Sequence, residues 1–327
     1  MKIGKVPEAV LKRSVLKQIH NRREEVLVGA SVGEDCAAIV TAEDEMLVMS
    51  TDPITGTVQD IGELAIQITI NDLASAGAEP VGVMLTVLLP ERISEQKLRY
   101  MIEQAEEACA KVNVQIMGGH TEVTKAVNQP LISVVGIGKA KKGKIISTAG
   151  ARPGMDIVIT KWIGLEGTSI IAKEKESELL TYFTQPFLNQ AKAFDQMLSV
   201  LPEASVAVCH GVAAMHDVTE GGIFGALWEM AEASGVGLEI DLKKIPIKQE
   251  TIEICEFFEI NPYELISSGS MLMAAEDGNT IVHELQKAGI HAVVVGKAVT
   301  GNDRILYTEQ ERRFLEPPKS DELYKVV

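Results

Sequence analysis

The chain has 327 residues, of which 46% are hydrophobic and 24% charged, the composition of a globular protein with two ordinary domains. Acidic residues outnumber basic residues by 46 to 31, and the formal net charge of −15 argues against a nucleic-acid partner because an acidic surface repels phosphate backbones. No apolar run reaches the length of a membrane span, and the N-terminus lacks a secretory signal. We therefore expect a cytoplasmic protein without a membrane partner.

The first half of the chain alternates predicted strands and helices. Its second helix, for example, carries Leu98, Met101 and Ile102 at helical spacing. In chain order we expect a strand, a helix, a strand, a helix and two strands, over residues 46–52, 62–76, 81–90, 94–112, 114–119 and 130–138. This alternation predicts an α/β unit with helices packed against a sheet.

A basic stretch interrupted by glycine and proline, residues 139–156, predicts a domain boundary. A second α/β series follows, with a strand over 156–160, helices over 186–200, 221–234 and 280–288, and strands over 236–241, 270–275 and 292–297. We expect an N-terminal domain over residues 1–150, a C-terminal domain over 151–300 and a charged tail over 301–327 that forms a surface appendage.

The four cysteines, Cys36, Cys109, Cys209 and Cys255, are widely scattered along the chain. Their spacing is typical neither of a zinc site nor of a dense disulfide framework. We expect all four to be buried free thiols.

Asp72 lies in the middle of the helix predicted over residues 62–76, on the face that also carries Ala65, Ile68 and Ala76. An unpaired buried charge costs several kcal/mol, so this carboxylate requires a cation, a set of hydrogen-bond donors or a wet cleft. Capping cannot explain an aspartate in the middle of a helix. Asp72 is therefore a candidate ligand-binding residue.

Three further aspartates stand where predicted elements end: Asp35 in "VGEDCAAIV", Asp52 in "MSTDPITGT" and Asp217 in "MHDVTEGG". Taken singly, each can be a turn residue or a helix cap, and for one residue alone the structural explanation is favoured. The stretches "STD", "MGGHTEVT" and "TEGG" are expected to be loops whose backbone N–H groups can approach phosphate oxygens. Oxygen ligands with retained water suit magnesium on a nucleotide's phosphates.

Six stretches in this order resemble the superfamily of aminoimidazole ribonucleotide (AIR) synthetase, selenophosphate synthetase, thiamine-monophosphate kinase and the hydrogenase maturation protein HypE. They lie within residues 33–223 and read "GEDCAAI", "STDPITGT", "NDLASAGAEP", "GGHTEVT", "GARPGMDIVIT" and "HDVTEGG". The resemblance implies a two-domain α/β fold of the AIR synthase type, whose N-terminal strands form a shared β-barrel in a homodimer. It also implies an ATP site in a cleft between the domains.

The resemblance carries roles to individual residues of this chain. Carboxylates that hold magnesium on the triphosphate map onto Asp35, Asp52, Asp72 and Asp217. Positions that contact the nucleotide or its metals map onto Gly33, Thr51, Asn71, Gly118, Gly119 and His120. The catalytic base has no assignment.

Within the superfamily, "NDLASAGAEP" and "GARPGMD" are most similar to HypE. The resemblance implies an enzyme that uses Mg-ATP to phosphorylate and so activate an amide- or carbamoyl-type oxygen of a small molecule or a partner group. HypE carries a cysteine at its C-terminus, whereas this chain ends "ELYKVV", so the acceptor is unassigned. The alternatives are a catalytically silent ATP-binding accessory protein in a maturation complex, or a metabolite kinase or synthetase of the same superfamily.

Overall fold

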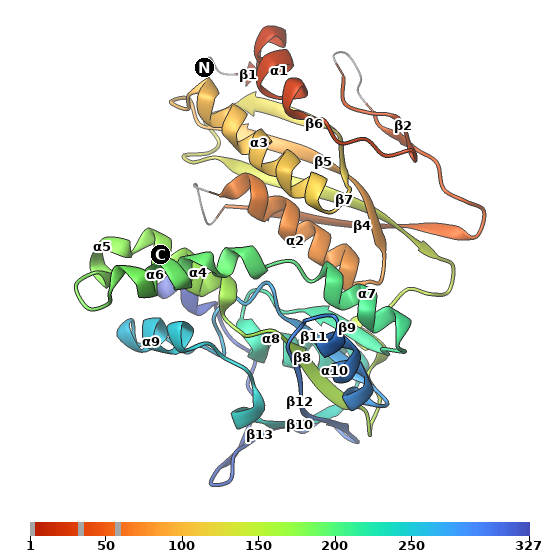
Figure 1. Cartoon of the computed structure of the whole chain (residues 1–327), viewed down its shortest axis with the longest axis vertical. Helices are drawn as coiled ribbons and strands as arrows, with labels where there is room; N and C mark the ends of the chain where they lie inside the picture. Colours follow the sequence, from red (N-terminus) through yellow and green to blue (C-terminus); the bar gives the residue numbers. More distant parts are fainter. Residues whose placement is uncertain (1–3, 32–35, 56–59) are drawn as a thin grey trace. The chain divides into compact units, whose positions relative to one another are not determined.

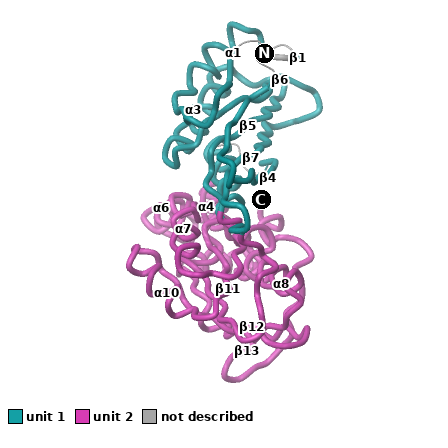
Figure 2. Tube along the Cα trace, turned by 90° about the vertical axis from the view of Figure 1, so that its right-hand side faces the viewer, with its two compact units in different colours: residues 1–74, 78–145 teal, residues 75–77, 146–327 magenta. Residues whose placement is uncertain are grey.

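The computed structural model describes residues 4–31, 36–55 and 60–327, which divide into two compact units (Figure 1, Figure 2). Unit 1 comprises the chain up to Ala74 together with Ala78–Ile145, and unit 2 comprises Ser75–Gly77 and Ile146–Val327. Within the described ranges, no helix is both long enough and apolar enough to cross a membrane.

Unit 1 is built on a mixed sheet with the strand order β1-β6-β5-β7-β4. Strand β5 pairs in parallel with β6 and antiparallel with β7, and β7 pairs antiparallel with β4. The strands are β1 Gly4–Lys5, β4 Glu45–Ile54, β5 Glu79–Leu89, β6 Gln115–Val123 and β7 Leu131–Lys141, and a separate ribbon pairs β2 Val26–Val28 with β3 Ala38–Ile39.

Helices α2 (Ile61–Ser75) and α3 (Glu95–Lys111) lie side by side on one face of this sheet (Figure 1). The approach between them is close, because a Cβ atom on Gly62 of α2 would lie 2.1 Å from the carbonyl oxygen of Met101 on α3. A Cβ atom on Gly136 of β7 would lie 2.4 Å from Thr69 of α2. Glycine at these two positions therefore allows α2 to pack directly against helix α3 and strand β7.

The opposite face of the sheet is open. Along β4 the exposed side chains alternate with half-buried ones, as expected for a strand covered on one face. Leu47 and Met49, on the open face, are 48% and 63% exposed. The sheet of unit 1 therefore presents large apolar side chains on the face that α2 and α3 do not cover.

The strands predicted over 46–52 and 114–119 extend further than expected, so that "STD" and most of "MGGHTEVT" lie within strands β4 and β6 and do not form loops. Pairing with β5 and β7 along their lengths supplies backbone hydrogen bonds that the local glycine pattern does not reveal. Gly119 makes the extension of β6 feasible: its φ is +145°, and an added Cβ atom would lie 2.0 Å from the carbonyl oxygen of Leu85. Only glycine fits this backbone.

An ion-pair network joins the chain before β2 to strands β5 and β7 of the sheet. The Glu25 carboxylate accepts hydrogen bonds from Arg23 at 2.7 Å and from Lys139 of β7 at 2.6 Å. Arg23 also pairs with Glu79 at the start of β5, at 2.7 Å. The Arg23 guanidinium beside Glu25 holds the pKa of that carboxyl well below its usual range.

Unit 2 is built on a second mixed sheet with the order β14-β13-β10-β12-β8-β11-β9. Its central strand β8 is buried on both faces, with Ile157 and Ile159 in the core formed with helix α8 and Val158 beside Gly278 of α10. The strands are β8 Asp156–Thr160, β9 Ala214–Asp217, β10 Gly237–Asp241, β11 Met271–Ala275, β12 Ala292–Val299, β13 Arg304–Tyr307 and β14 Arg312–Phe314.

A smaller apolar cluster of unit 2 is formed by helices α4, α6 and α9 with the last residues of the chain. The remaining α-helices are α1 Glu8–Ser14, α4 Leu165–Glu174, α5 Glu176–Leu179, α6 Gln185–Lys192, α7 Leu201–Cys209, α8 Gly222–Ser234, α9 Gln249–Phe257 and α10 Gly278–Lys287.

Two further sequence-based expectations differ from the structure. The stretch after residue 300 is not a surface appendage, because β13 and β14 extend the sheet of unit 2 and Leu323 is 6% exposed. Cys109 and Cys255 are buried free thiols as expected, whereas Cys36 and Cys209 are exposed. Neither difference is visible in local sequence patterns, because long-range pairing and packing produce both.

Replacing Glu25 by glutamine is expected to lower the free energy of unfolding by about 1–3 kcal/mol at pH 7, since Arg23 and Lys139 lose a charged acceptor. Because the folded pKa of Glu25 is depressed, its contribution is complete above the ordinary carboxyl pKa and is lost as the pH falls toward the folded value. Urea unfolding at pH 7 and pH 3 checks this, with exposed Glu43→Gln as control. An equal loss at both pH values would contradict it.

Gly119→Ala is expected to destabilise the protein by at least about 1–3 kcal/mol, because the added methyl group clashes with the Leu85 backbone. Gly118→Ala is the matched control: its Cβ atom would meet the terminal methyl of Met84 at 3.4 Å, an ordinary contact, so its effect is expected to stay within about 0.5 kcal/mol. Thermal unfolding measures the stability of the two variants relative to wild type. Equal effects would show that the backbone around Gly119 can relax.

Candidate functional site

Predicted site residues on β4 and β6 lie in common rows across the sheet of unit 1. Thr51 is paired with Val135 of β7, which is paired with Met84 of β5, which is paired with Gly118 of β6. The next two rows, each read from β4 to β6, are Asp52–Val134–Leu85–Gly119 and then Pro53–Ser133–Thr86–His120. Three strand spacings of about 4.8 Å separate the ends of each row by about 14 Å. One ion cannot contact both ends of a row. Side chains of successive rows point to opposite faces of the sheet, so Asp52 faces α2 whereas Thr51 and His120 lie on the open face.

Asp72 and Asp52 converge on the same strand. The Ser50 hydroxyl of β4 donates a hydrogen bond to Oδ2 of Asp72 on α2. Asp52 follows two residues later on β4 and points to the same face of the sheet, about 7 Å along the strand. Two aspartates that the sequence places 20 residues apart therefore lie on the same side of β4, separated by about two residues along that strand.

The helix face that carries Asp72 is less deeply buried than expected. Ile68, Asp72 and Ala76 are half-buried, whereas Asn71 is fully buried, at 0% exposure. The half-buried position leaves the Asp72 carboxylate reachable from solvent. Asn71, by contrast, belongs to the packed interior of α2.

His120 is exposed on β6, and its Nε2 lies 3.2 Å from a carboxylate oxygen of Glu122. A histidine beside a carboxylate can donate a proton or bind a metal, but this one points away from the helices, in the row of Thr86 on the open face. His120 is thus on the face opposite to Asp52.

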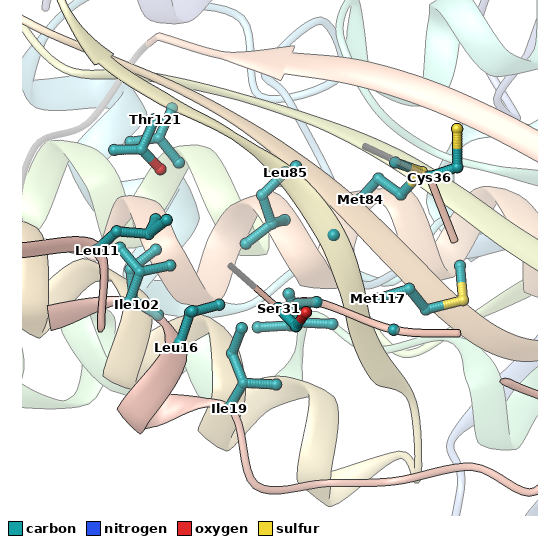
Figure 3. A pocket seen from close by; sticks show the side chains of 17 residues that line it. Leu11, Leu16, Ile19, Ser31, Cys36, Met84, Leu85, Ile102, Met117 and Thr121 are labelled. Carbon is teal, nitrogen blue, oxygen red and sulfur yellow. The ribbon is translucent and has the colours of Figure 1, made fainter. Parts of the chain in front are cut away.

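A cavity of about 60 Å³ adjoins β6 and is lined by Gly118 and Gly119 as well as by Ser31 and Cys36 (Figure 3). Its sulfur-bearing side chains lie at one end and aliphatic residues of α1 and of the turn Leu16–Gln18 at the other. The cavity can hold water but is far smaller than the pockets of about 300–1,000 Å³ that enclose whole ligands. It nevertheless brings the flanks of the "GEDC" motif next to the glycine pair of β6.

In unit 2, Asp217 ends strand β9 beside Met271 of β11 and is 5% exposed. The "TEGG" turn then leads into α8, with Gly221 and Gly222 at φ values of +81° and +60°. A Cβ atom on Gly222 would lie 2.6 Å from the carbonyl oxygen of Tyr263. The glycine pair thus fits both the turn and the backbone packed against it.

Two acidic residues near this turn escaped the sequence analysis. Glu166, in the first turn of α4, is 2% exposed, and burial raises its pKa to about 7. Asp321, near the chain end, is also 2% exposed, and burial raises its pKa as well. A buried carboxyl group in the first turn of a helix has no sequence signature distinct from an exposed one, so only packing reveals it.

The donor set at Asp52 and Asp72 fits a hard divalent cation, because it consists of carboxylate and hydroxyl oxygens with access to water. Across residues 4–31, 36–55 and 60–327 there is no group of three or more His, Cys, Asp or Glu side chains placed to hold a metal ion. Gly33 and Asp35 lie outside the described residues, and Asp217 belongs to unit 2.

Comparison with known proteins gives a consistent result. Residues 33–140 match the family "AIR synthase related protein, N-terminal domain", and residues 152–308 match the corresponding C-terminal domain. A putative hydrogenase expression/formation protein of Methanocaldococcus jannaschii is 29% identical over 99% of this chain and 97% of its own length.

The carbamoyl dehydratase HypE of Cupriavidus necator is 30% identical over 76% of this chain and 72% of its own length. A crystal structure of HypE in complex with ATP superposes with a TM-score of 0.82 at 20% identity, covering 99% of this chain and 97% of that one. Sequence and fold agree across both domains. The chain therefore belongs to the AIR synthase-related superfamily of ATP-dependent enzymes, as a HypE-like member with the two-domain α/β fold of that superfamily.

Proposed function

We propose that this protein uses Mg-ATP to phosphorylate, and so activate, an amide- or carbamoyl-type oxygen of a small molecule or of a group on a partner protein. The observation that carries the proposal is the convergence of Asp72 and Asp52 on β4, beside the hydroxyl of Ser50. Similarity to a carbamoyl dehydratase and to a HypE that binds ATP supports this choice of chemistry.

Asp52 and Asp72 are the proposed magnesium ligands in unit 1. Magnesium, when bound, neutralises charge on the phosphate oxygens of ATP. Ser50 orients Asp72 by donating a hydrogen bond to Oδ2 of its carboxylate. Thr51, Asn71, Gly118, Gly119 and His120 are proposed nucleotide contacts. Thr51 and His120 lie on the open face of the sheet, whereas Asp52 and Asp72 lie on the face that α2 covers.

The proposed phosphoryl transfer requires mainly that the protein position the reacting groups and neutralise their charge. Phosphoryl transfer from ATP to a carbamoyl oxygen forms an O–P bond and breaks the bond to the ADP leaving group. Loss of phosphate from the activated group, with two protons passing from its nitrogen to the surroundings, then completes a dehydration. Fixed carboxylates and backbone donors are suited to this task because they need little rearrangement during the reaction.

We further propose a protein partner, since one of the similar structures is a HypE–HypF complex that superposes with a TM-score of 0.73. A cytoplasmic location fits the exposed free thiols of Cys36 and Cys209, which a reducing compartment preserves.

Titration calorimetry with ATP tests the site directly. Wild-type protein is expected to bind ATP in a magnesium-dependent manner, and Asp52→Asn or Asp72→Asn to weaken this binding by about 10–100-fold. Asp44→Asn, an exposed residue paired with Lys141 beside the same strand, is the control and is expected to bind normally. Asp217→Asn tests the predicted contribution of unit 2 in the same assay.

Absence of ATP binding by wild type, or undiminished binding by both Asp52→Asn and Asp72→Asn, would rule the proposal out. ATP consumption is then assayed with carbamoylated thiols and amide-bearing metabolites. Binding without turnover on any acceptor would favour the catalytically silent accessory protein instead.

We also propose that the open face of the unit 1 sheet pairs with a second copy of the chain, in the shared β-barrel that the resemblance implies. Leu47 and Met49 of β4 lie exposed on this face. Val135 of β7 and Met84 of β5 are half-buried on the same face and are paired with each other. Apolar side chains gathered on one sheet face favour burial against a partner.

Met49→Glu is expected to convert a dimer into a monomer, because it places a charge in the centre of the proposed interface. Light scattering after gel filtration measures the mass. Tyr182→Glu, which alters a 74% exposed side chain of unit 2, is the matched control and is expected to leave the dimer intact. A monomeric wild type, or a Met49→Glu variant that stays dimeric, contradicts the interface.

A further inference from the structure

Four of the chain's seven phenylalanines gather with one tyrosine on unit 2, where α5, α6 and α9 meet (Figure 1). Ring centroids of neighbouring members lie 4.6–5.9 Å apart. Aromatic residues make up only 4% of the chain, so this gathering is not a consequence of composition. The members of this aromatic cluster are Tyr182, Phe183, Phe187, Phe257 and Phe258.

The inner side of the aromatic cluster rests on the core of unit 2. Its four phenylalanines are half-buried and pack against the buried apolar residues of α4, α6 and α9. Phe183 and Phe187 stack at 4.6 Å with an angle of 12° between the ring planes. Because this packing fixes the rings before any partner arrives, binding on their outer side costs little side-chain entropy.

The outer side of the aromatic cluster is not explained by the fold. Tyr182 is 74% exposed, and its ring stands edge-on to Phe183 at 4.9 Å. Leu180, two residues earlier, is 42% exposed. A ring this exposed contributes little to the free energy of unfolding, whereas adjoining exposed apolar side chains are typical of a protein interaction site. Tyrosine is also enriched among the residues that dominate the binding energy of such sites.

Acidic residues flank both stretches that supply the aromatic cluster. The sequence "EFFE" places two of its phenylalanines between Glu256 and Glu259, which are both exposed. Neither of these glutamates forms an ion pair with another described residue. The other stretch, residues 180–187, follows the exposed Glu178. The aromatic cluster therefore has carboxylates at its rim.

The charge at this rim selects the kind of partner. Lys192 of α6 is already paired with Glu176, and Lys175 is half-buried, so the exposed charge is mainly negative. A second copy of the chain would bring two acidic rims together, and anionic lipid headgroups would be repelled in the same way. A polypeptide segment with apolar side chains between lysines or arginines matches both the aromatic centre and the acidic rim.

We propose that the aromatic cluster binds a segment of a partner protein that presents apolar side chains flanked by lysine or arginine. The rings of Tyr182, Phe183 and Phe257 supply the apolar contact, and Glu256 and Glu259 attract the basic flanks. The inference rests on the protein partner of the proposed function and specifies its chemistry. It requires neither ATP nor the carboxylates of unit 1.

Binding of a labelled peptide to the full chain, measured by fluorescence anisotropy without nucleotide, tests the aromatic cluster. The probe has a core of alternating leucine and phenylalanine with lysines at both ends, and the comparison peptide carries glutamates in place of these lysines. The lysine peptide is expected to bind at least about tenfold more tightly at low salt. The difference is expected to shrink as salt is added, because screening weakens the attraction to the acidic rim.

Two variants with matched controls locate the binding. Tyr182→Ala removes the most exposed ring of the cluster and is expected to weaken binding of the lysine peptide about tenfold. Tyr100→Ala, which removes a 53% exposed ring from α3, is expected to bind as wild type. Glu256→Lys is expected to weaken binding by about three- to tenfold at low salt. Glu43→Lys makes the same charge change at an exposed residue of unit 1 and is expected to have no effect.

Weaker binding confined to Tyr182→Ala and Glu256→Lys supports the proposed docking site. Absence of binding by wild type, equal binding of the two peptides, or undiminished binding by Tyr182→Ala overturns it. Equal effects of Glu256→Lys and Glu43→Lys would show attraction to the overall charge of the chain and overturn it as well, even where Tyr182→Ala fails to fold.

Light scattering separates the remaining occupant, a second copy of the chain. A smaller mass for Tyr182→Ala than for wild type would place that copy on the aromatic cluster and overturn the proposal, whereas an unchanged mass supports it. Since the peptide titration contains no nucleotide, its failure is distinguishable from a failure of ATP binding in the calorimetric assay.

Discussion

The packing of α2 on its sheet decides where unit 1 can place acidic side chains. A close contact at Gly136 of β7 brings α2 near the sheet, and the Ser50 hydroxyl of β4 reaches Asp72. A larger residue at Gly136 would move the helix away from the sheet, and the carboxylate of Asp72 would lose its hydrogen bond to Ser50. The candidate magnesium site thus depends on a helix–sheet distance set by one residue without a side chain, while Gly62 sets the distance between α2 and α3.

The protein handles its buried or half-buried carboxylates in three ways. Glu25 is neutralised by Arg23 and Lys139. Asp72 is held by a hydroxyl donor and stays half-buried, which suits a group that binds a cation only when ligand is present. Glu166 is almost fully buried, and this burial raises its pKa. The chain has 46 acidic and 31 basic residues, so lysine and arginine cannot neutralise every carboxylate.

Several parts of the candidate site could be predicted from sequence and others could not. Asp72 was recognisable because a carboxylate in the middle of an apolar helix has few explanations. The strand predicted over 114–119 was expected to give way to a loop at "HTEV", because glycine pairs usually mark turns, yet pairing with β5 continues the strand to Val123. Ser50 and Asp321 escaped notice, since a hydroxyl or carboxyl group acquires its role only from a neighbour distant in sequence.

The sequence by itself determined the two-domain α/β character, the superfamily and the main strands with helices α2, α3, α8 and α10, because hydrophobic periodicity and short motifs are local properties. Helices α1, α4, α5, α7 and α9 were not predicted. Tertiary structure alone decided the strand order, the rows that link Thr51 with Gly118, the exposure of Cys36 and the docking of the chain end on Gly221. These features arise from contacts between residues tens to more than one hundred positions apart. Local patterns carry no information about such contacts, because the free energy that fixes them comes from burial and pairing in the assembled fold.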